Sequence, residues 1–333
     1  MHFAFTDDQL LFRDAVRDLL AKECKPEVVR DAWTNDSGRV PGLWGMLVDM
    51  GVGALTAPEG VGGLGMNEVD LVLLQEEAGR AALPDVLIEH TAVALPLLAE
   101  VGESAWLTKA GAGEAIVGVG IGSPYVLYAD QCDVLLLVHE GALHAVPRAE
   151  VSLTAQRSVD YSRRLFSVSW TPSPSTQIAS GDQAQQAVVD ACDRGALAAA
   201  AQCVGIAQRL IDVTVEYVGQ REQFGKIVGS YQAVKHQLAN ALLAVEFARP
   251  LTYVAAYALA NTTPHRARDV SVAKAVASDA VDKAARTALQ CHGAIGYTFE
   301  YDLHLWMKRG WALAAAWGDA ATHRGRVGRS LDM

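Results

Sequence analysis

Basic residues are scarce in this sequence, and several common targeting patterns are missing. Lysine and arginine number 28 against 38 acidic residues, so the net charge is −10. The absence of any basic run argues against a general nucleic-acid binder, because phosphate neutralisation needs clustered Lys and Arg. The N-terminus lacks the charged and apolar regions of a signal peptide, and no run of about 18 apolar residues is present to cross a bilayer. We expect a cytoplasmic protein with no membrane or nucleic-acid partner.

Cysteine is also scarce, and histidine shows no ligand spacing. The five cysteines are odd in number and widely separated: Cys24, Cys132, Cys192, Cys203 and Cys291. They match neither a disulfide framework nor a zinc pattern. The nine histidines are scattered without paired spacing, which argues against a metal site. We therefore expect reduced core thiols and no bound metal.

The 333 residues are 51% apolar and 20% charged, which is typical of a globular protein with two or three domains. Apolar residues at helical spacing predict N-terminal helices over residues 6–24, 42–49, 67–79 and 86–99. Short runs rich in β-branched residues predict strands at 115–120, 134–138, 143–146 and 165–170. Helical patterns return at 183–220, 231–259, 267–291 and 301–316, each long enough to cross a four-helix bundle.

These elements predict an α+β fold that is mostly α. An N-terminal helical domain is expected at residues 1–110, a small β-domain built as a barrel or sandwich at 111–180, and a C-terminal four-helix bundle at 181–333. The segment Pro58–Gly65 has four glycines in six residues but no flanking strand and helix, so we interpret it as a structural turn rather than a phosphate loop. The acidic pair Glu76-Glu77 is interpreted as a solvated face or a helix-terminus partner.

The stretch from Arg221 to His236 combines a cation, an aromatic ring, a glycine and an amide between two helices. Arg221 offers a planar fork of donors suited to phosphate. Phe224 offers a flat apolar face, and Gln232 an amide that can donate and accept. These three residues suggest a clamp for a nucleotide-containing ligand. The alternative is a plain helix connection with an exposed arginine and a core phenylalanine.

Several motifs agree in order and spacing with one known family. They are Val204-Gly205-Ile206-Ala207-Gln208-Arg209, Arg221-Glu222-Gln223-Phe224-Gly225-Lys226, Tyr231-Gln232-Ala233-Val234, Gln290-Cys291-His292-Gly293-Ala294-Ile295-Gly296-Tyr297 and Glu300-Tyr301. With them the chain resembles the acyl-CoA dehydrogenase flavoproteins. The resemblance is strong from Val204 onward and weak in the β-domain.

The resemblance implies an FAD cofactor, an acyl-CoA substrate and an electron-transfer flavoprotein or similar acceptor. In this family the bundle of one subunit reaches FAD held mainly by its neighbour. The resemblance implies that Arg221 pairs with the pyrophosphate of FAD and that Phe224 packs near the adenine. It also implies that Gln232 hydrogen-bonds the same half of FAD. Gln290, with the backbone of Gly293 and Ala294, is expected to contact the nucleotide from a helix end where unpaired amides favour anions.

The family's catalytic base is missing, so no catalytic residue is predicted. Counting from Glu300-Tyr301 places Trp317 at the usual glutamate position, and counting back from Val204 places Gly195 at the alternative one. Indole has no acid–base use at neutral pH. Asp319 and Asp193 are candidates for a relocated base, but Asp319 is interpreted as a helix-end carboxylate. Segments that bind the flavin ring in the family also lack clear counterparts in the β-domain.

A chain that keeps nucleotide contacts but lacks the base resembles the short subunit of α2β2 acyl-CoA dehydrogenases of actinobacterial steroid catabolism. A homologous catalytic subunit is then the expected partner, and a bulky CoA thioester the expected substrate. Three alternatives remain open at this point: a homomeric enzyme with a relocated base, a relative with flavin monooxygenase-like chemistry, and a structural or regulatory subunit.

Overall fold

A computed structural model describes residues 4–331 and divides into two compact units. We call the first the bundle unit; it holds the chain up to Glu27, Val72–Leu83, and the chain from Ala199 onward. The second, the sheet unit, holds Val28–Leu71 and Pro84–Ala198. The limits predicted at residues 110 and 180 stay a prediction, although the strands of both main sheets lie between Val117 and Ala179.

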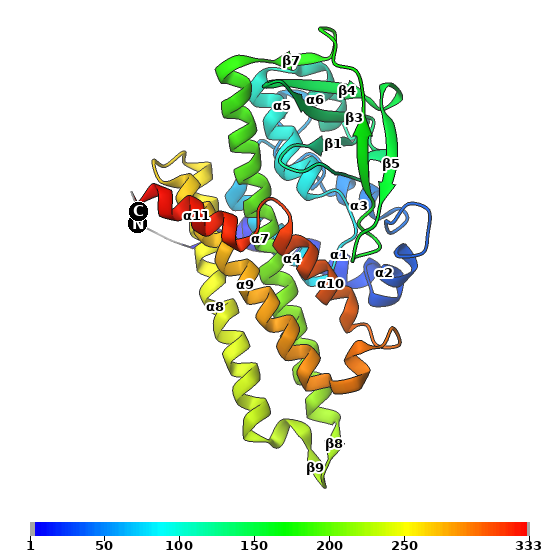
Figure 1. Cartoon of the computed structure of the whole chain (residues 1–333), viewed down its shortest axis with the longest axis vertical. Helices are drawn as coiled ribbons and strands as arrows, with labels where there is room; N and C mark the ends of the chain where they lie inside the picture. The colour runs from blue at the N-terminus through cyan, green and yellow to red at the C-terminus, as the bar shows by residue number, and fades with distance from the viewer. Residues whose placement is uncertain (1–3, 332–333) are drawn as a thin grey trace. The chain divides into compact units, whose positions relative to one another are not determined.

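The bundle unit is built from long helices (Figure 1). They are α1 (Asp7–Glu23), the second half of α7 (Gly181–Gln220), α8 (Gln232–Ala260), α9 (Arg266–His292), α10 (Leu303–Ala315) and α11 (Ala320–Ser330). Helix α8 packs along α9, which also contacts α10 and α11. Thr6 is the N-cap of α1 and forms a capping box with Gln9. The four predicted bundle helices are confirmed, and α11 is an additional one.

Helix α4 (Glu68–Arg80) crosses α7 with backbones in contact. A Cβ on Gly205 would lie 1.9 Å from the carbonyl oxygen of Glu76, and a Cβ on Gly79 would lie 2.1 Å from that of Gln202. Any side chain at either position would collide with backbone, so both glycines are needed for this crossing. The glycine of the Val204-Gly205 motif thus has a packing role.

The acidic pair on α4 is buried, so its interpretation as a solvated face is wrong. Arg249 lies 3.0 Å from one oxygen of Glu76, and the Tyr253 hydroxyl donates to the other at 2.7 Å. Arg17 lies 2.5 Å from Glu77. Helices α1, α7 and α8 cover this part of α4, and each buried carboxylate therefore needs a cation as its partner.

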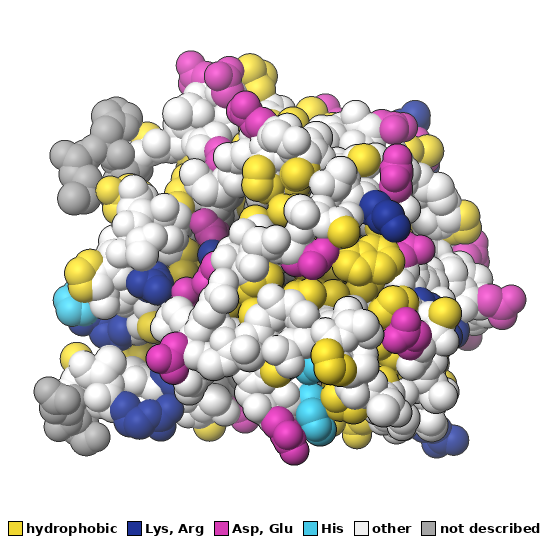
Figure 2. Space-filling view, turned by 90° about the horizontal axis from the view of Figure 1, so that it is seen from above, with side chains coloured by type: hydrophobic (Ala, Val, Ile, Leu, Met, Phe, Trp, Pro, Cys, Tyr) yellow, Lys and Arg dark blue, Asp and Glu magenta, His cyan; other side chains and the backbone are white. Residues whose placement is uncertain are grey.

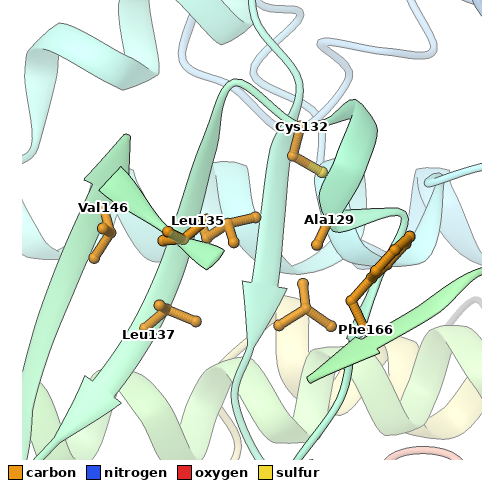
Figure 3. Close-up of a cluster of buried hydrophobic side chains, with 8 residues drawn as sticks. Ala129, Cys132, Leu135, Leu137, Val146 and Phe166 are labelled. Atoms are coloured by element: carbon orange, nitrogen blue, oxygen red, sulfur yellow. The ribbon is translucent and has the colours of Figure 1, made fainter. Parts of the chain in front are cut away.

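The sheet unit contains two sheets. One has the order β1 (Val117–Gly120), β3 (Val134–His139), β4 (Ala142–Pro147) and β7 (Gln177–Ala179); the other has the order β2 (Val126–Leu127), β6 (Leu165–Ser169) and β5 (Ser152–Gln156). Strand β1 pairs with β3 in parallel, and all other pairs in these two sheets are antiparallel. Side chains from both sheets form one buried cluster, as in a sandwich: Val126, Ala129, Cys132, Leu135, Leu137, Val146, Val151 and Phe166 (Figure 3).

The predicted strands are confirmed, while β2, β5 and β7 were not predicted. Strands β2 and β7 are only two and three residues long, and β5 is largely polar and exposed, so none gave a clear pattern. The helices of this unit are α2 (Pro26–Ala32), α3 (Leu43–Asp49), α5 (Leu95–Val101) and α6 (Ser104–Gly111). The helix predicted at 86–99 begins as a buried π-helical turn, Ile88–Ala94, before α5.

The glycine-rich loop of the sheet unit folds back on itself. Its short helix, Glu59–Val61, is followed by Gly62 at φ 90°, and a Cβ on Gly63 would lie 2.1 Å from the carbonyl oxygen of Ala57. The loop therefore packs too closely against its own backbone to serve as a cradle. The interpretation as a structural turn is supported by this packing.

Two helices are long and apolar enough to cross a membrane when judged by length and composition alone. The apolar window of α7 is 78% buried inside the protein and that of α8 is 39% buried. A core helix meets the same test, so this is weak evidence for a membrane span. On the face of the molecule in Figure 2, Lys and Arg are interspersed with Asp and Glu and form no continuous patch. All five cysteines are free.

Candidate functional site

The predicted clamp is a β-hairpin at one end of the bundle unit (Figure 1). Arg221 follows α7 directly, and β8 (Glu222–Gln223) pairs with β9 (Lys226–Ile227). Phe224 and Gly225 form the tip, with φ angles of 53° and 79°. Two successive left-handed residues are typical of a type I′ turn. Glycine adopts this backbone conformation without strain, whereas phenylalanine seldom does. The Val228 N–H donates to the Arg221 carbonyl at 2.7 Å and closes the hairpin.

The side chains of the hairpin point into solvent. The Phe224 residue is 93% exposed, so the alternative of a core phenylalanine is wrong. Arg221 is also exposed, and within residues 4–331 no carboxylate lies within ion-pair distance of its guanidinium. An uncovered ring and an unpaired cation on one hairpin are what a clamp for an aromatic anion requires.

The beginning of α8 lies next to the hairpin. The Tyr231 hydroxyl donates to the Gln223 carbonyl at 3.2 Å, and the Lys226 ammonium lies 4.3 Å from the centre of the Tyr231 ring. Tyr231 is the N-cap of α8, and Gln232 is its first residue, with an exposed side chain. These contacts hold Gln232 close to the strand that carries Lys226.

The second predicted group lies at the C-terminal end of α9. Gln290 is exposed in the last turn, and Gly293 ends the helix at φ 66°. The expectation that unpaired amides of this helix end favour an anion is wrong for α9, because a C-terminal end leaves carbonyls unpaired. Ala294 lies in the short turn Gly293–Tyr297 with an ordinary negative φ, so alanine fits there without backbone strain.

A stack of rings brings the two groups to the same end of the bundle. Tyr217 lies one helical turn before Arg221, and its ring packs on His292 with centroids 4.3 Å apart. Its hydroxyl donates to the His292 carbonyl at 3.4 Å. Burial lowers the pKa of His292, which keeps the ring neutral at pH 7. The sequence analysis missed Tyr217, whose only signal was an aromatic residue four positions before the arginine.

The position of the usual base carries no carboxylate. Trp317 is half-buried with φ 58°, and its carbonyl accepts a hydrogen bond from His323 Nε2 at 2.9 Å. Asp319 is exposed and is the N-cap of α11, with Oδ1 accepting from the Thr322 N–H at 2.8 Å. That backbone hydrogen bond lowers the pKa of Asp319, whereas a general base for an acyl-CoA needs a raised one.

The alternative base position lies in the first half of α7, within the sheet unit. Gly195 occupies it, is buried, and offers no side chain. Its neighbour Arg194 pairs with Glu68 and Glu100, both at 3.1 Å. Asp193 is 1% exposed. Neither of the two positions therefore presents a carboxylate of the kind the family uses.

The sequence matches two family models, "Acyl-CoA dehydrogenase, N-terminal domain" over residues 6–113 and "Acyl-CoA dehydrogenase, C-terminal domain" over residues 186–331. It is 33% identical to the acyl-CoA dehydrogenase IpdE2 of Mycobacterium tuberculosis over 305 residues, which is 91% of each chain. The chain belongs to the acyl-CoA dehydrogenase family. The two matched ranges leave out residues 114–185, the strand region in which the resemblance was already weak.

Two solved structures confirm the fold. The ChsE4–ChsE5 complex of Mycobacterium tuberculosis contains a chain with a TM-score of 0.90 at 23% identity, covering 100% of this chain and 99% of that one. Butyryl-CoA dehydrogenase of Megasphaera elsdenii gives a TM-score of 0.86 at 20% identity and full coverage of both. The predicted α+β, mostly α, acyl-CoA dehydrogenase-like fold is therefore confirmed.

The residues at the end of the bundle fit the cofactor of this family. FAD carries a pyrophosphate and a flat adenine, and the hairpin presents an unpaired guanidinium at its base and an uncovered phenyl ring at its tip. Gln232 and Gln290 add exposed amides, and nothing lies within 4 Å of a Cβ placed on Gly293, which leaves its backbone open to approach.

Proposed function

We propose that this chain is the base-lacking subunit of a heteromeric FAD-dependent acyl-CoA dehydrogenase that forms a 2-enoyl-CoA from a bulky acyl-CoA. The observation that carries the proposal is the hairpin tip, where Phe224 is 93% exposed and turned away from its own chain. An apolar ring of this size gains stabilisation only when something covers it. We propose that the Phe224 ring is covered by the adenine half of an FAD that a homologous partner subunit mainly binds.

The missing base supports a division of labour between two kinds of subunit. A flavin accepts the hydride from the β-carbon, and a carboxylate must remove the α-proton. This chain has Trp317 and Gly195 where such a carboxylate is expected, and Asp319 caps a helix. The proton-accepting group is therefore assigned to the partner. This chain contributes Arg221 at the pyrophosphate and Phe224 and Gln232 at the adenosine. It also contributes Gln290 from the last turn of α9, and Gly293 and Ala294 from the turn that follows.

Helix α8 supports the presence of a partner. Its exposed face carries apolar side chains at spacings of three, four and seven residues: Leu243, Phe247, Val254 and Tyr257. Phe247 is the most exposed of the four, at 69%. An apolar stripe with this spacing is suited to packing against another helix. We infer that it meets the homologous subunit in an α2β2 assembly, and that an electron-transfer flavoprotein or similar carrier reoxidises the flavin.

The substrate class is inferred from relatives. One structure with a TM-score of 0.87, at 21% identity and 98% coverage of both chains, is described as the Tcur3481–Tcur3483 steroid ACAD. The structure with ChsE4 and ChsE5 is described as a complex of the two. A steroid-derived CoA thioester is therefore the substrate that we propose for this assembly.

Co-expression with a homologous, base-containing acyl-CoA dehydrogenase subunit tests the proposal. The chain alone is expected to purify with little flavin, and the complex is expected to be yellow and active. Phe224→Ser should leave the fold intact and reduce the flavin bound per complex, while Leu11→Ser, at another exposed apolar residue on α1, should change neither. A yellow, fully active preparation of the lone chain would refute the proposal.

A further inference from the structure

A cavity in the bundle unit lies outside the group of residues assigned to FAD. It is open to solvent, has a volume of about 280 Å³, and is lined by the end of α1 and the residues that follow it, the end of α4, and one residue each from α7 and α10. Its lining is Arg17, Leu20, Ala21, Cys24, Lys25, Pro26, Glu77, Arg80, Ala81, Arg209 and Trp306. None of these residues belongs to the hairpin, the start of α8 or the end of α9.

The charge of the lining is opposite to that of the chain. Four cations and one carboxylate surround the cavity, although the protein as a whole has a net charge of −10. Glu77 is bound to Arg17 at 2.5 Å, and Arg80 lies 2.8 Å from Asp212, so these charges are already matched. Lys25 and Arg209 have no carboxylate within ion-pair distance in the part of the chain that the structure describes. Two cations are therefore available to an anionic ligand.

Trp306 gives the cavity a rigid apolar wall. It is 5% exposed, and its indole N–H donates to the Arg80 carbonyl at 2.8 Å, which fixes the plane of the ring. The Arg209 guanidinium carbon lies over the indole ring, 5.4 Å from its centre, so the ring holds this cation in place at the wall of the cavity. Leu20, Pro26 and Ala81 complete an apolar surface beside the two available cations.

From this arrangement we propose that the cavity binds a small amphipathic anion, with its carboxylate between Lys25 and Arg209 and its apolar body against Trp306. The volume lies just below the range of about 300–1,000 Å³ for drug-sized pockets, which suits a compact one- or two-ring acid. The guanidinium of Arg209, already oriented by the indole, loses little side-chain freedom on binding. This site is independent of the proposed flavin function.

Isothermal titration of the purified chain with 2-naphthoate tests the site. We expect one binding site per chain, with affinity that falls as salt is raised. Arg209→Gln should weaken binding about tenfold or more, since it removes the charge-assisted contact to the carboxylate. Lys25→Gln should weaken it several-fold. The matched control is Lys22→Gln, which should leave the affinity unchanged. Lys22 lies three residues before Lys25, in the last turn of α1, and is paired with Glu23.

A filling substitution and a neutral probe complete the experiment. Ala21 is exposed on α1 and lines the cavity, so Ala21→Phe should abolish binding without altering charge or the buried core. Neutral 2-naphthamide should bind at least tenfold more weakly than 2-naphthoate, and acetate should not bind measurably. The proposal is overturned if 2-naphthoate does not bind at millimolar concentration, if Arg209→Gln and Lys25→Gln bind it as the wild type does, or if the amide binds equally well.

Discussion

The ring of Tyr217 lies on the ring of His292, with centroids 4.3 Å apart and planes within 19° of each other. The two residues are 75 positions apart in the chain, and each stands beside one of the two predicted FAD-binding segments. Tyr301 packs against both rings, at 5.8 Å from Tyr217 and 4.9 Å from His292. The stack therefore sets the spacing between the end of α7, which carries the hairpin, and the end of α9.

Removing the stack should loosen the cofactor site before it affects the fold. In the flavin-loaded complex, Tyr217→Ala is expected to raise the dissociation constant for FAD about tenfold, because Arg221 and Gln290 lose their common support. Tyr217→Phe keeps the ring and removes only the 3.4 Å hydrogen bond, so it should retain most of the affinity. Fluorescence titration of the apo-complex with FAD gives both constants. Equal losses in the two variants would mean that the hydroxyl, and not the stack, holds the segments together.

Two glycines of α7, one at the crossing with α4 and one away from it, should respond in opposite ways to replacement by alanine. Gly205→Ala places a methyl group 1.9 Å from the Glu76 carbonyl oxygen and should destabilise the protein by about 3 kcal/mol or more, since the backbones must separate. Gly219→Ala meets nothing within 4 Å and should stabilise the helix by about 0.5–1 kcal/mol. Urea denaturation of both variants measures the two changes. A tolerated Gly205→Ala would show that the helices do not touch as described.

Burial of His90 predicts a loss of stability in acid. The desolvated ring, near the Arg39 cation, has its pKa lowered to about 4, while the unfolded chain takes up that proton near 6.5. Because the unfolded state binds more protons between these values, the contribution is complete above pH 6.5 and is lost as pH falls towards 4. It amounts to roughly 3 kcal/mol.

The matched variant for this effect is His90→Asn. Its amide oxygen can accept the Val117 N–H that Nδ1 accepts at 3.0 Å, but the side chain does not titrate. The variant should be less stable at neutral pH and should show a flatter dependence of unfolding free energy on pH between 4 and 6.5. An unchanged slope would assign the acid sensitivity to other groups.

The sequence predicted those features that depend on local pattern and on motif spacing. Periodicity predicted α1 and the four long bundle helices, and motif spacing assigned Trp317 to the position of the base. Features that depend on tertiary contact were missed or misread. Glu76 and Glu77 were interpreted as surface residues because nothing in the local sequence shows that they will form ion pairs with Arg249 and Arg17 in the folded chain.

The geometry of the hairpin turn and the shortest strands also could not be predicted from the sequence pattern. The exposed tip at Phe224 follows from a left-handed backbone that composition does not reveal, since phenylalanine seldom adopts it. Strands β2 and β7 are stabilised by neighbours in their sheets and carry too few residues for alternation to be visible. The stack of Tyr217 on His292 joins distant segments, so only the folded chain shows it.

Asp319 separates the two-subunit proposal from a homomeric enzyme with a relocated base. Its carboxylate caps α11 through the Thr322 N–H at 2.8 Å, so Asp319→Ala should lower the melting temperature of the protein. Asp319→Asn keeps an acceptor at the cap and should restore most of that stability. Neither variant should change the rate of enoyl-CoA formation per bound flavin in the complex, nor the pKa values in its pH–rate profile. A cap-preserving Asn variant that folds normally, retains flavin and loses the rate would make Asp319 the base, because it keeps the cap and lacks the ionisable carboxylate that accepts the proton.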